Sequence, residues 1–573
     1  MGRPLEKTLR DSAPHVLNYR RSLTSLALGE LTNRTSVTLV RNLRHARLRT
    51  LTVRSVAVSN IWNHIRAVEH IDKKMADVED VTIKDYARDM SLESIPTNVA
   101  YRVNGVHMYA DIQNLQDMLE ITQVEGTDCH KRTLRFLDQH YRAVKRILDK
   151  VDARRVDFHS QRLHSLFTKP YDSETDAEKK RVQRAVATAQ LIIDVLAETG
   201  DDVEKIPAAK VRIGIDTGLS LAVNNGRNGY REPLFLGDPA NHAAKLASNN
   251  SARGIYLTNA ARDAIGLAEK NSPEKAPLTT EEIKVCQEAA KLGVTSDEIV
   301  KEWREDLKNN PIGGYQFTRQ TPPLCDMDIS KLTPANSKRQ EMVSTYADID
   351  GFTAYVAENI DDNAEDVVRT LHVLRAELER VVTSDFRGRR VRFIGDCIQA
   401  LTCDGTAHNT DEQKTVSEAT RLAGALRSSF NLAIERLGAK GYETGDLGLA
   451  IGFDLGPISV TRLGKHGDRI RCAIGRKVIE SENRQCACKG TETAIGQAAY
   501  DAASDAVKTL FGTKRKTTNL DYVEATEALA DKGDESAKQA RSEAYAGAPA
   551  VILANDREVR PYAITVADKS NQC

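Results

Sequence analysis

Two aspartates occupy positions at which carboxylates could bind metal ions. Asp348 lies in YADIDGFTAYV and Asp396 lies in FIGDCIQAL, and each follows a short apolar run. Such runs, bounded by Gly or Asp, are typical of central strands, so both carboxylates are expected at strand ends. Carboxylate oxygens are the ligands that Mg²⁺ prefers, and the ion keeps part of its shell for water and phosphate. The pair therefore indicates metal-assisted chemistry at a phosphate, although aspartates also end strands without any function.

An internal repeat contains these aspartates in its second copy. The first copy holds VHMYADIQNL around Asp111, RRVDFHSQRLHSLF around Gln161, KVRIGIDTGLSLAV, and PLFLGDPANHAAKLAS around Gly237. The second copy holds VSTYADIDGFTAYV, RRVRFIGDCIQAL, LGLAIGFDLGPISV and IRCAIGRKVIESENR in the same order. The three later markers lie 50, 105 and 126 residues after Asp111, and 48, 106 and 127 residues after Asp348. Four markers in register indicate a duplicated domain.

The elements around the markers predict an α+β fold in which helices cover a sheet. Each copy has apolar residues spaced by three and four between its first two markers, which predicts a helix packed on a sheet. These residues are Leu134, Leu137, Tyr141, Val144 and Leu148 in the first copy and Val367, Leu371, Leu374, Leu378 and Val381 in the second. The predicted organisation is a helical N-terminal extension (1–95), a first domain (96–320), a Pro-rich linker (321–339) and a second domain (340–573). Two charged helical insertions, at about 268–310 and 522–547, have no assigned role.

Both copies resemble the catalytic domain of class III adenylyl and guanylyl cyclases, the second strongly and the first as a divergent copy. The resemblance implies two tandem domains, each with a central, mostly antiparallel sheet covered by helices, that form an intramolecular pseudo-dimer. It also implies two Mg²⁺ or Mn²⁺ ions per site, held by Asp348, Asp396 and the backbone carbonyl of Ile349. The expected reaction is in-line attack of the ribose 3′ hydroxyl on the α-phosphate, with pyrophosphate leaving. The residues whose backbone N–H groups would bind the triphosphate are Asp350, Gly351, Phe352 and Thr353.

In this family the active site lies between two domains, and the two copies are degenerate in complementary ways. The first copy has Gln161 where the second metal aspartate should be, so it is not expected to hold a metal pair. Counting four and eight residues from the glycine of the last motif gives Asn241 and Lys245 in the first copy, but Ile479 and Asn483 in the second. The resemblance implies that Asn241 orients the ribose and Lys245 stabilises charge on the α-phosphate. Lys replaces the family's Arg and lacks its bidentate fork; the alternative is a solvated helix face.

Two positions of the first copy would read the base. Counting three residues back from Ser160 and from Gly237 gives Asp157 and Leu234, and neither is a residue that reads adenine in this family. A carboxylate can accept the imide N–H of uracil or of guanine, whereas cytosine offers it only an amino group. Asp157 therefore suits either UTP or GTP on hydrogen-bond grounds, and ATP is not favoured. The alternative for Asp157 is that it faces water beside Arg155.

The motif YADIDGFTAY, with its reduced base-reading pair, also resembles the Pycsar pyrimidine cyclases of bacterial antiphage defence. This resemblance implies a cyclic UMP or cyclic CMP product that acts on a separate effector protein. Uridylate cyclase is the preferred activity, with cytidylate, guanylate and adenylate cyclase as alternatives. A different functional class stays open as an alternative. In it, the two domains are catalytically idle, bind a nucleotide and regulate another protein. That reading predicts loss of the metal carboxylates, yet Asp348 and Asp396 are both present.

The composition is that of an ordinary globular protein. The 573 residues include 81 Lys plus Arg and 81 Asp plus Glu, so no global basic field indicates a nucleic-acid partner. No leader segment and no long apolar run is found, so the cytoplasm is expected and membrane attachment is not. The nine cysteines are scattered and are expected to be reduced thiols. The expected state is a monomer with an internal pseudo-dimer, and further dimerisation stays open.

Overall fold

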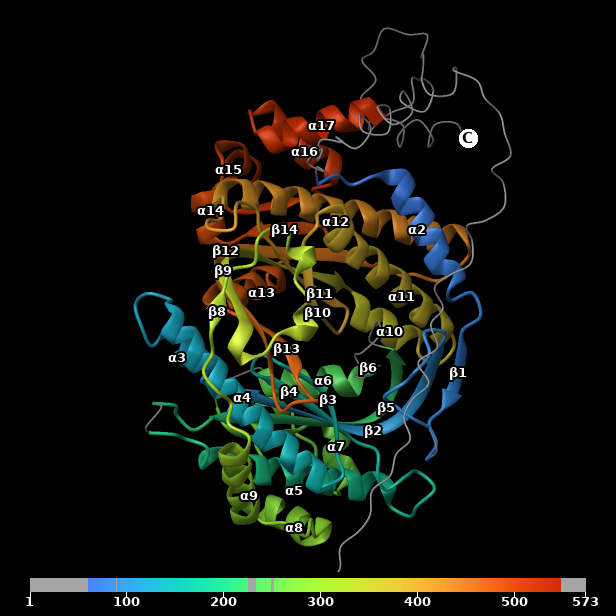
Figure 1. The fold of residues 1–573 in the computed structure, drawn as a ribbon. Helices are drawn as coiled ribbons and strands as arrows, with labels where there is room; N and C mark the ends of the chain where they lie inside the picture. The colour runs from blue at the N-terminus through green and yellow to red at the C-terminus, as the bar shows by residue number, and fades with distance from the viewer. Residues whose placement is uncertain (1–59, 89, 203–204, 225–232, 249–251, 548–573) are drawn as a thin grey trace, which may run out of the picture. The chain divides into compact units, whose positions relative to one another are not determined.

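The first copy forms a seven-stranded, mainly antiparallel sheet (Figure 1). The computed structural model describes residues 60–88, 90–202, 205–224, 233–248 and 252–547. The sheet order is β3-β4-β2-β5-β6, with β1 parallel to β2 and β7 parallel to β5. The strands are β1 (Thr82–Asp85), β2 (Val99–Ile112), β3 (Arg154–His159), β4 (Arg162–Phe167), β5 (Val211–Asn224), β6 (Pro233–Leu236) and β7 (Gly254–Leu257).

The second copy repeats this topology in an eight-stranded sheet. Its order is β10-β11-β9-β12-β14-β15, with β13 antiparallel to β12 and β8 parallel to β9. The strands β9 to β14 correspond one by one to strands of the first sheet, which confirms the duplication. The strands are β8 (Phe317–Thr318), β9 (Ser337–Asp350), β10 (Arg389–Ile394), β11 (Cys397–Thr402), β12 (Gly448–Leu463), β13 (Ile470–Ile474), β14 (Glu492–Ile495) and β15 (Lys516–Thr518).

Helices cover both sheets, and the two predicted apolar helices are confirmed as α4 (Thr127–Lys150) and α11 (Ala364–Arg380). In Figure 1, α4 and α5 lie along the first sheet, and α11 and α12 along the second. The remaining α-helices among the described residues are α2 (His64–Ala76), α3 (Leu115–Glu120), α5 (Ala177–Ala197), α6 (Asp238–Ser248), α7 (Asn259–Ala264), α8 (Thr280–Ala290), α9 (Ser296–Asn309), α10 (Phe352–Asn359), α12 (Glu412–Ala439), α13 (Arg476–Cys486), α14 (Gln497–Ala502), α15 (Asp505–Phe511), α16 (Tyr522–Asp531) and α17 (Glu535–Gly547). The pairs α8 with α9 and α16 with α17 are the two charged insertions.

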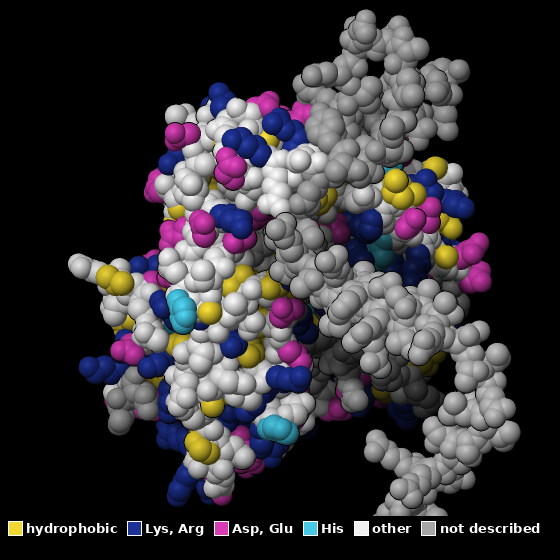
Figure 2. Space-filling view, turned by 45° about the horizontal axis from the view of Figure 1, so that its top comes forward, with side chains coloured by type: hydrophobic (Ala, Val, Ile, Leu, Met, Phe, Trp, Pro, Cys, Tyr) yellow, Lys and Arg dark blue, Asp and Glu magenta, His cyan; other side chains and the backbone are white. Residues whose placement is uncertain are grey.

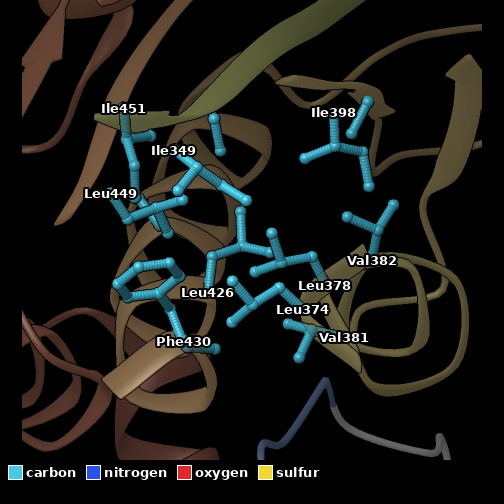
Figure 3. Close-up of a cluster of buried hydrophobic side chains, with 14 of the residues drawn as sticks. Ile349, Leu374, Leu378, Val381, Val382, Ile398, Leu426, Phe430, Leu449 and Ile451 are labelled. Atoms are coloured by element: carbon cyan, nitrogen blue, oxygen red, sulfur yellow. The ribbon is translucent and has the colours of Figure 1, made fainter. Parts of the chain in front are cut away.

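The second sheet has a hydrophobic cluster on each face, and successive residues of β9 point to opposite faces. Val343, Ala347 and Ile349 of β9 belong to the core formed with α11 and α12. Figure 3 shows Ile349 in this core, near Leu426 and Leu449. Met342 and Tyr346 belong instead to the cluster on the opposite face, which faces α13. Asp348 lies an even number of residues from Met342 and Tyr346 on β9, so its side chain points to the same face as theirs.

Residues 321–339, which the Pro content favours as a linker, pack on the second copy. They form three short 3₁₀ turns, Leu324–Asp326, Ile329–Lys331 and Pro334–Asn336. The side chains of Leu324 and Ile329 are fully buried in the cluster that contains Tyr346. The apolar residues between the prolines therefore make this segment part of the second core, and β8 extends the second sheet from residues that precede it.

The described part of the N-terminal extension contacts both copies: helix α2 packs on the second copy, and β1 joins the first sheet beside β2. Helix α2 lies between α11 and α12, where Trp62 donates a hydrogen bond to Ser429 at 2.7 Å. Arg66 and His70 both contact Glu377, which is fully buried on α11, at 2.6 Å. The extension predicted to be helical over 1–95 is helical at His64–Ala76 but forms the strand β1 at Thr82–Asp85, and residues 1–59 lie outside the described part.

The surface shows no face of one charge in the view of Figure 2, where acidic and basic side chains are interspersed. The eight cysteines among the described residues form no disulfide. None of the helices in the described ranges combines the length and the apolar composition needed to cross a membrane.

Candidate composite active site

Asp348 lies near the end of β9 on the face directed toward α13, and it is half-buried. Burial, followed by the nearby Asp350 carboxylate, raises the pKa of Asp348 to about 6. Hydrogen bonds from the Gln485 amide and the Cys397 thiol oppose the shift. The carboxylate is therefore held in a partly desolvated position where a cation would stabilise its charged form.

Asp396 lies in the tight turn between β10 and β11, where Gly395 adopts a positive φ of 62°. Burial and then the Asp348 carboxylate raise the pKa of Asp396, and the backbone N–H of Ile349 donates a hydrogen bond to it. That bond places the Asp396 carboxylate against β9, beside Asp348. The Asp348 carboxylate thus disfavours ionisation of Asp396, as expected for a pair that shares a site for cations.

The donor set fits divalent cations with hard oxygen ligands. The described residues contain no group of three or more His, Cys, Asp or Glu side chains arranged as a metal site. The pair of aspartates would accordingly need further oxygen ligands, from water, a triphosphate or a carbonyl. The Ile349 side chain is 2% exposed and points into the core (Figure 3), so only its backbone could contribute.

The turn after β9 is shaped for a close approach to its backbone. Gly351 has a φ of 83° and precedes α10, and a Cβ at this position would lie 3.1 Å from the Asp446 carbonyl oxygen. Phe352 is buried in the core, whereas Thr353 is exposed. The Asp350 carboxylate accepts a hydrogen bond from the Gly490 N–H at 2.7 Å, so this side chain is directed toward its own domain.

Helix α6 of the first copy brings Asn241 to this turn. The Asn241 amide donates a hydrogen bond to the Thr353 hydroxyl at 3.3 Å, across the boundary between the copies. Lys245 follows one turn later and is exposed, so its ammonium group is accessible to a ligand. The structure therefore brings together a residue of each copy at the N-terminus of α10, as the complementary degeneracy of the motifs predicts.

The two predicted base-reading residues are not side by side in the first sheet. Asp157 is on β3 and Leu234 is on β6, the two ends of the principal strand order. Leu234 is 9% exposed and packs in the core of the second copy. Asp157 forms an ion pair with Arg392 of β10 at 3.1 Å, and Arg392 also donates to the Phe158 carbonyl at 2.9 Å. Asp157 therefore does not simply face water.

Arg392 was not predicted from the sequence. The signal was available, because Arg392 stands three residues before Gly395, as Asp157 stands three residues before Ser160. Counting three residues back from the hairpin glycine of the second copy as well would have identified Arg392 as the counterpart of Asp157. Their contact couples the two hairpins of the duplicated domain.

The equivalent of the metal pair in the first copy has a different charge pattern. Asp111 is the cross-strand partner of Arg162, which forms an ion pair with Glu482 of α13 at 2.7 Å. Burial raises the pKa of Asp111 to about 6, although the Arg162 guanidinium opposes the shift. The Arg162 guanidinium therefore supplies a positive charge beside Gln161, the residue that replaces the second metal aspartate.

Comparison with known proteins gives close relatives. No protein-family model matches the chain. A uridylate cyclase from Pseudomonas aeruginosa is 80% identical over 513 residues, which are 90% of this chain and 100% of that protein. A uridylate cyclase from a Rhizobium species is 36% identical over 436 residues, or 73% of this chain and 82% of that protein.

A crystal structure shows the same fold. A class III adenylyl cyclase-like ATP-binding protein from Pseudomonas aeruginosa is 82% identical and has a TM-score of 0.81, over 82% of this chain and 99% of that chain. Class III cyclases generally depend on divalent metal ions, which agrees with the paired aspartates. The duplicated topology and these relatives together show that the chain belongs to the class III nucleotidyl cyclases, in the group of the uridylate cyclases.

Proposed function

We propose that this chain converts UTP to 3′,5′-cyclic UMP and pyrophosphate at one composite site. The observation that carries the proposal is the arrangement of Asp348 and Asp396 in one copy beside a turn that Asn241 of the other copy contacts. The choice of UTP rests on the relatives that are named uridylate cyclases. Their identity extends over most of this chain, including both copies.

Each copy contributes different residues to the proposed site. Two Mg²⁺ or Mn²⁺ ions at Asp348, Asp396 and the Ile349 carbonyl would activate the 3′ hydroxyl and neutralise the leaving pyrophosphate. The backbone N–H groups from Asp350 to Thr353 bind the triphosphate at the N-terminus of α10. Asn241 orients the ribose through its amide, and Lys245 stabilises the charge that develops on the α-phosphate. Both residues act from one face of α6, on which Asn241 is half-buried and Lys245 is exposed.

We assign base reading to Asp157 together with Arg392. Uracil presents an N3–H donor beside the O4 acceptor, and a carboxylate next to a guanidinium presents an acceptor beside donors. Guanine has the same pattern, whereas cytosine has an amino group and an unprotonated ring nitrogen. The pairing thus favours UTP over CTP on hydrogen-bond grounds. Leu234 contributes packing of the hydrophobic boundary between the copies rather than a polar contact.

The biological role that follows from the Pycsar resemblance is antiphage signalling. In this proposal cyclic UMP leaves the enzyme and binds a separate effector protein. The internal pseudo-dimer supplies both halves of the active site, so one chain is sufficient for catalysis.

The product profile of the purified full chain tests the proposal. The protein is incubated with UTP, CTP, GTP and ATP in turn, with Mg²⁺ and then with Mn²⁺, beside Asp396→Ala and Asn241→Ala. We expect cyclic UMP from UTP, lost in both variants, with correct folding of each checked by circular dichroism. A different cyclic nucleotide would contradict the base assignment, and equal activity of Asn241→Ala would contradict the composite site. ATP is an informative arm because the crystallised relative is described as ATP-binding.

A further inference from the structure

A cavity of about 280 Å³ lies between α2, α11 and the ends of β5 and β10. Val223 and Asn224 of the first copy and Phe393 of the second copy form parts of its wall, so both copies and the N-terminal helix build it. None of the residues assigned above to the metal ions, triphosphate, ribose or base lines it. The cavity is therefore separate from the composite site.

Cationic and N–H donor groups dominate the lining. Lys74 of α2 and Arg375 and Arg380 of α11 carry positive charges, and His70 and His372 add imidazole rings. Lys74 also pairs with Asp77, and His70 with Glu377, so the two arginines of α11 provide the main attraction for an anion. Glu379 is the one acidic residue of the lining, and it forms an ion pair with Arg390 at 3.2 Å. The hydroxyl groups of Thr97 and Ser384 supply further donors, whereas the Thr383 hydroxyl donates to the Glu379 carbonyl at 2.8 Å. An anion would meet attractive charge and hydrogen-bond donors from several directions.

Arg375 makes this arrangement unusual, because its side chain is largely withdrawn from water. The residue is 6% exposed, and its guanidinium stacks on the Phe393 ring at 3.9 Å from the centroid. Burial and the neighbouring Arg390 lower the pKa of Arg375 to about 9, and the Asp396 carboxylate opposes that shift. A buried arginine that lines a cavity attracts an anion more strongly than an exposed one, because the local dielectric is low. The mechanism proposed above does not use this residue.

The size of the cavity limits the ligand. Sites for drug-sized molecules occupy roughly 300–1,000 Å³, so this cavity is at the lower limit for an organic ligand. A compact oxyanion with several negative charges matches both the volume and the donors. We propose that the cavity binds a small phosphate-type oxyanion, either inorganic phosphate or the pyrophosphate that a cyclase releases. The binding step itself does not depend on the proposed reaction.

Calorimetric titration of the full chain in EDTA, without nucleotide, tests the site. Sodium pyrophosphate and sodium phosphate are titrated separately into wild type, Lys74→Gln and Arg380→Gln. The matched control is Lys73→Gln, which changes an exposed neighbour on α2. Lys245→Gln is a second control because it alters the composite site. We expect one anion per chain, with Kd raised by about tenfold or more in the two lining variants and unchanged in both controls.

Two results would overturn the proposal. The first is the absence of saturable binding of either anion to wild type. The second is loss of binding in Lys245→Gln with retention in Lys74→Gln and Arg380→Gln, because it would place the anion in the composite site. Tighter binding of pyrophosphate would identify the reaction product as the ligand, and equal or tighter binding of phosphate would identify the inorganic ion. Inactivity of the chain toward UTP would leave these titrations interpretable, so the two proposals can fail separately.

Discussion

Replacement of Asp348 by Asn should abolish cyclisation and yet stabilise the metal-free protein. The pKa of Asp348 is about 6 in the folded state, against an ordinary value of 3.8. The folded state therefore binds a proton that the unfolded state has lost between these two pH values, and stability falls as pH rises through this range. A difference of about two pH units corresponds to about 3 kcal/mol. This loss in the free energy of unfolding is fully present at about pH 7 and absent below about pH 4.

Urea unfolding of wild type and Asp348→Asn in EDTA measures this cost directly. At pH 7 the variant should be the more stable protein by about 3 kcal/mol, and at pH 5 the difference should shrink to about half. Asp362→Asn is the control, because Asp362 is an exposed acid in a turn after α10 and should change stability little at either pH. A variant that is less stable than wild type at pH 7, or a difference that does not change with pH, would refute the reasoning.

Addition of Mg²⁺ gives the same experiment a second arm. An ion that binds only the folded wild type at a hundred times its Kd would stabilise it by about 2.7 kcal/mol. The stability difference between wild type and Asp348→Asn should therefore narrow with Mg²⁺ at pH 7. An equal response of both proteins to Mg²⁺ would show that the ion does not bind through Asp348.

Three other substitutions test the roles assigned to single residues. Lys245→Ala should lower kcat by about a hundredfold or more, because it removes charge stabilisation in the transition state, whereas Lys245→Arg should retain or raise kcat; both are read from initial rates of cyclic UMP formation. Gly351→Ala should destabilise the turn by about 1–2 kcal/mol, measured as a lower urea midpoint, and should raise the KM for UTP. Arg392→Gln should reduce kcat/KM for UTP by about tenfold or more relative to CTP, measured with the two substrates in competition, and an unchanged ratio would remove Arg392 from base reading.

The parts of the fold that depend on local patterns were predictable. The apolar spacing at Leu134–Leu148 and Val367–Val381 identified α4 and α11, because one face of a helix must be apolar to pack on a sheet. The register of the repeat identified the duplicated sheets. Prolines and polar residues dominate the composition of segment 321–339 and favour a linker, whereas the few apolar side chains that pack it on the second copy, such as Leu324 and Ile329, carry no periodic signal.

Contacts between elements that are distant in sequence were the least predictable. The ion pair between Asp157 and Arg392 joins residues of the two copies, and α2 contacts α11 through Arg66 and Glu377. No local rule gives such partners, because they depend on how the copies and the extension pack. The placement of Asn241 beside Thr353 was predictable only because the two degenerate motifs complement each other.

The charge at the degenerate position suggests why the two copies stay different. In the second copy, the pKa values of Asp348 and Asp396 are both raised, so the pair gains from a divalent cation. In the first copy, Arg162 lies between Asp111 and Glu482, and the protein supplies its own cation. A second carboxylate at position 161 would pair with this guanidinium, and a metal cation would have to compete with the guanidinium for the carboxylates. In the proposed mechanism the first copy instead presents Asn241 and Lys245, and one chain has one composite site rather than two.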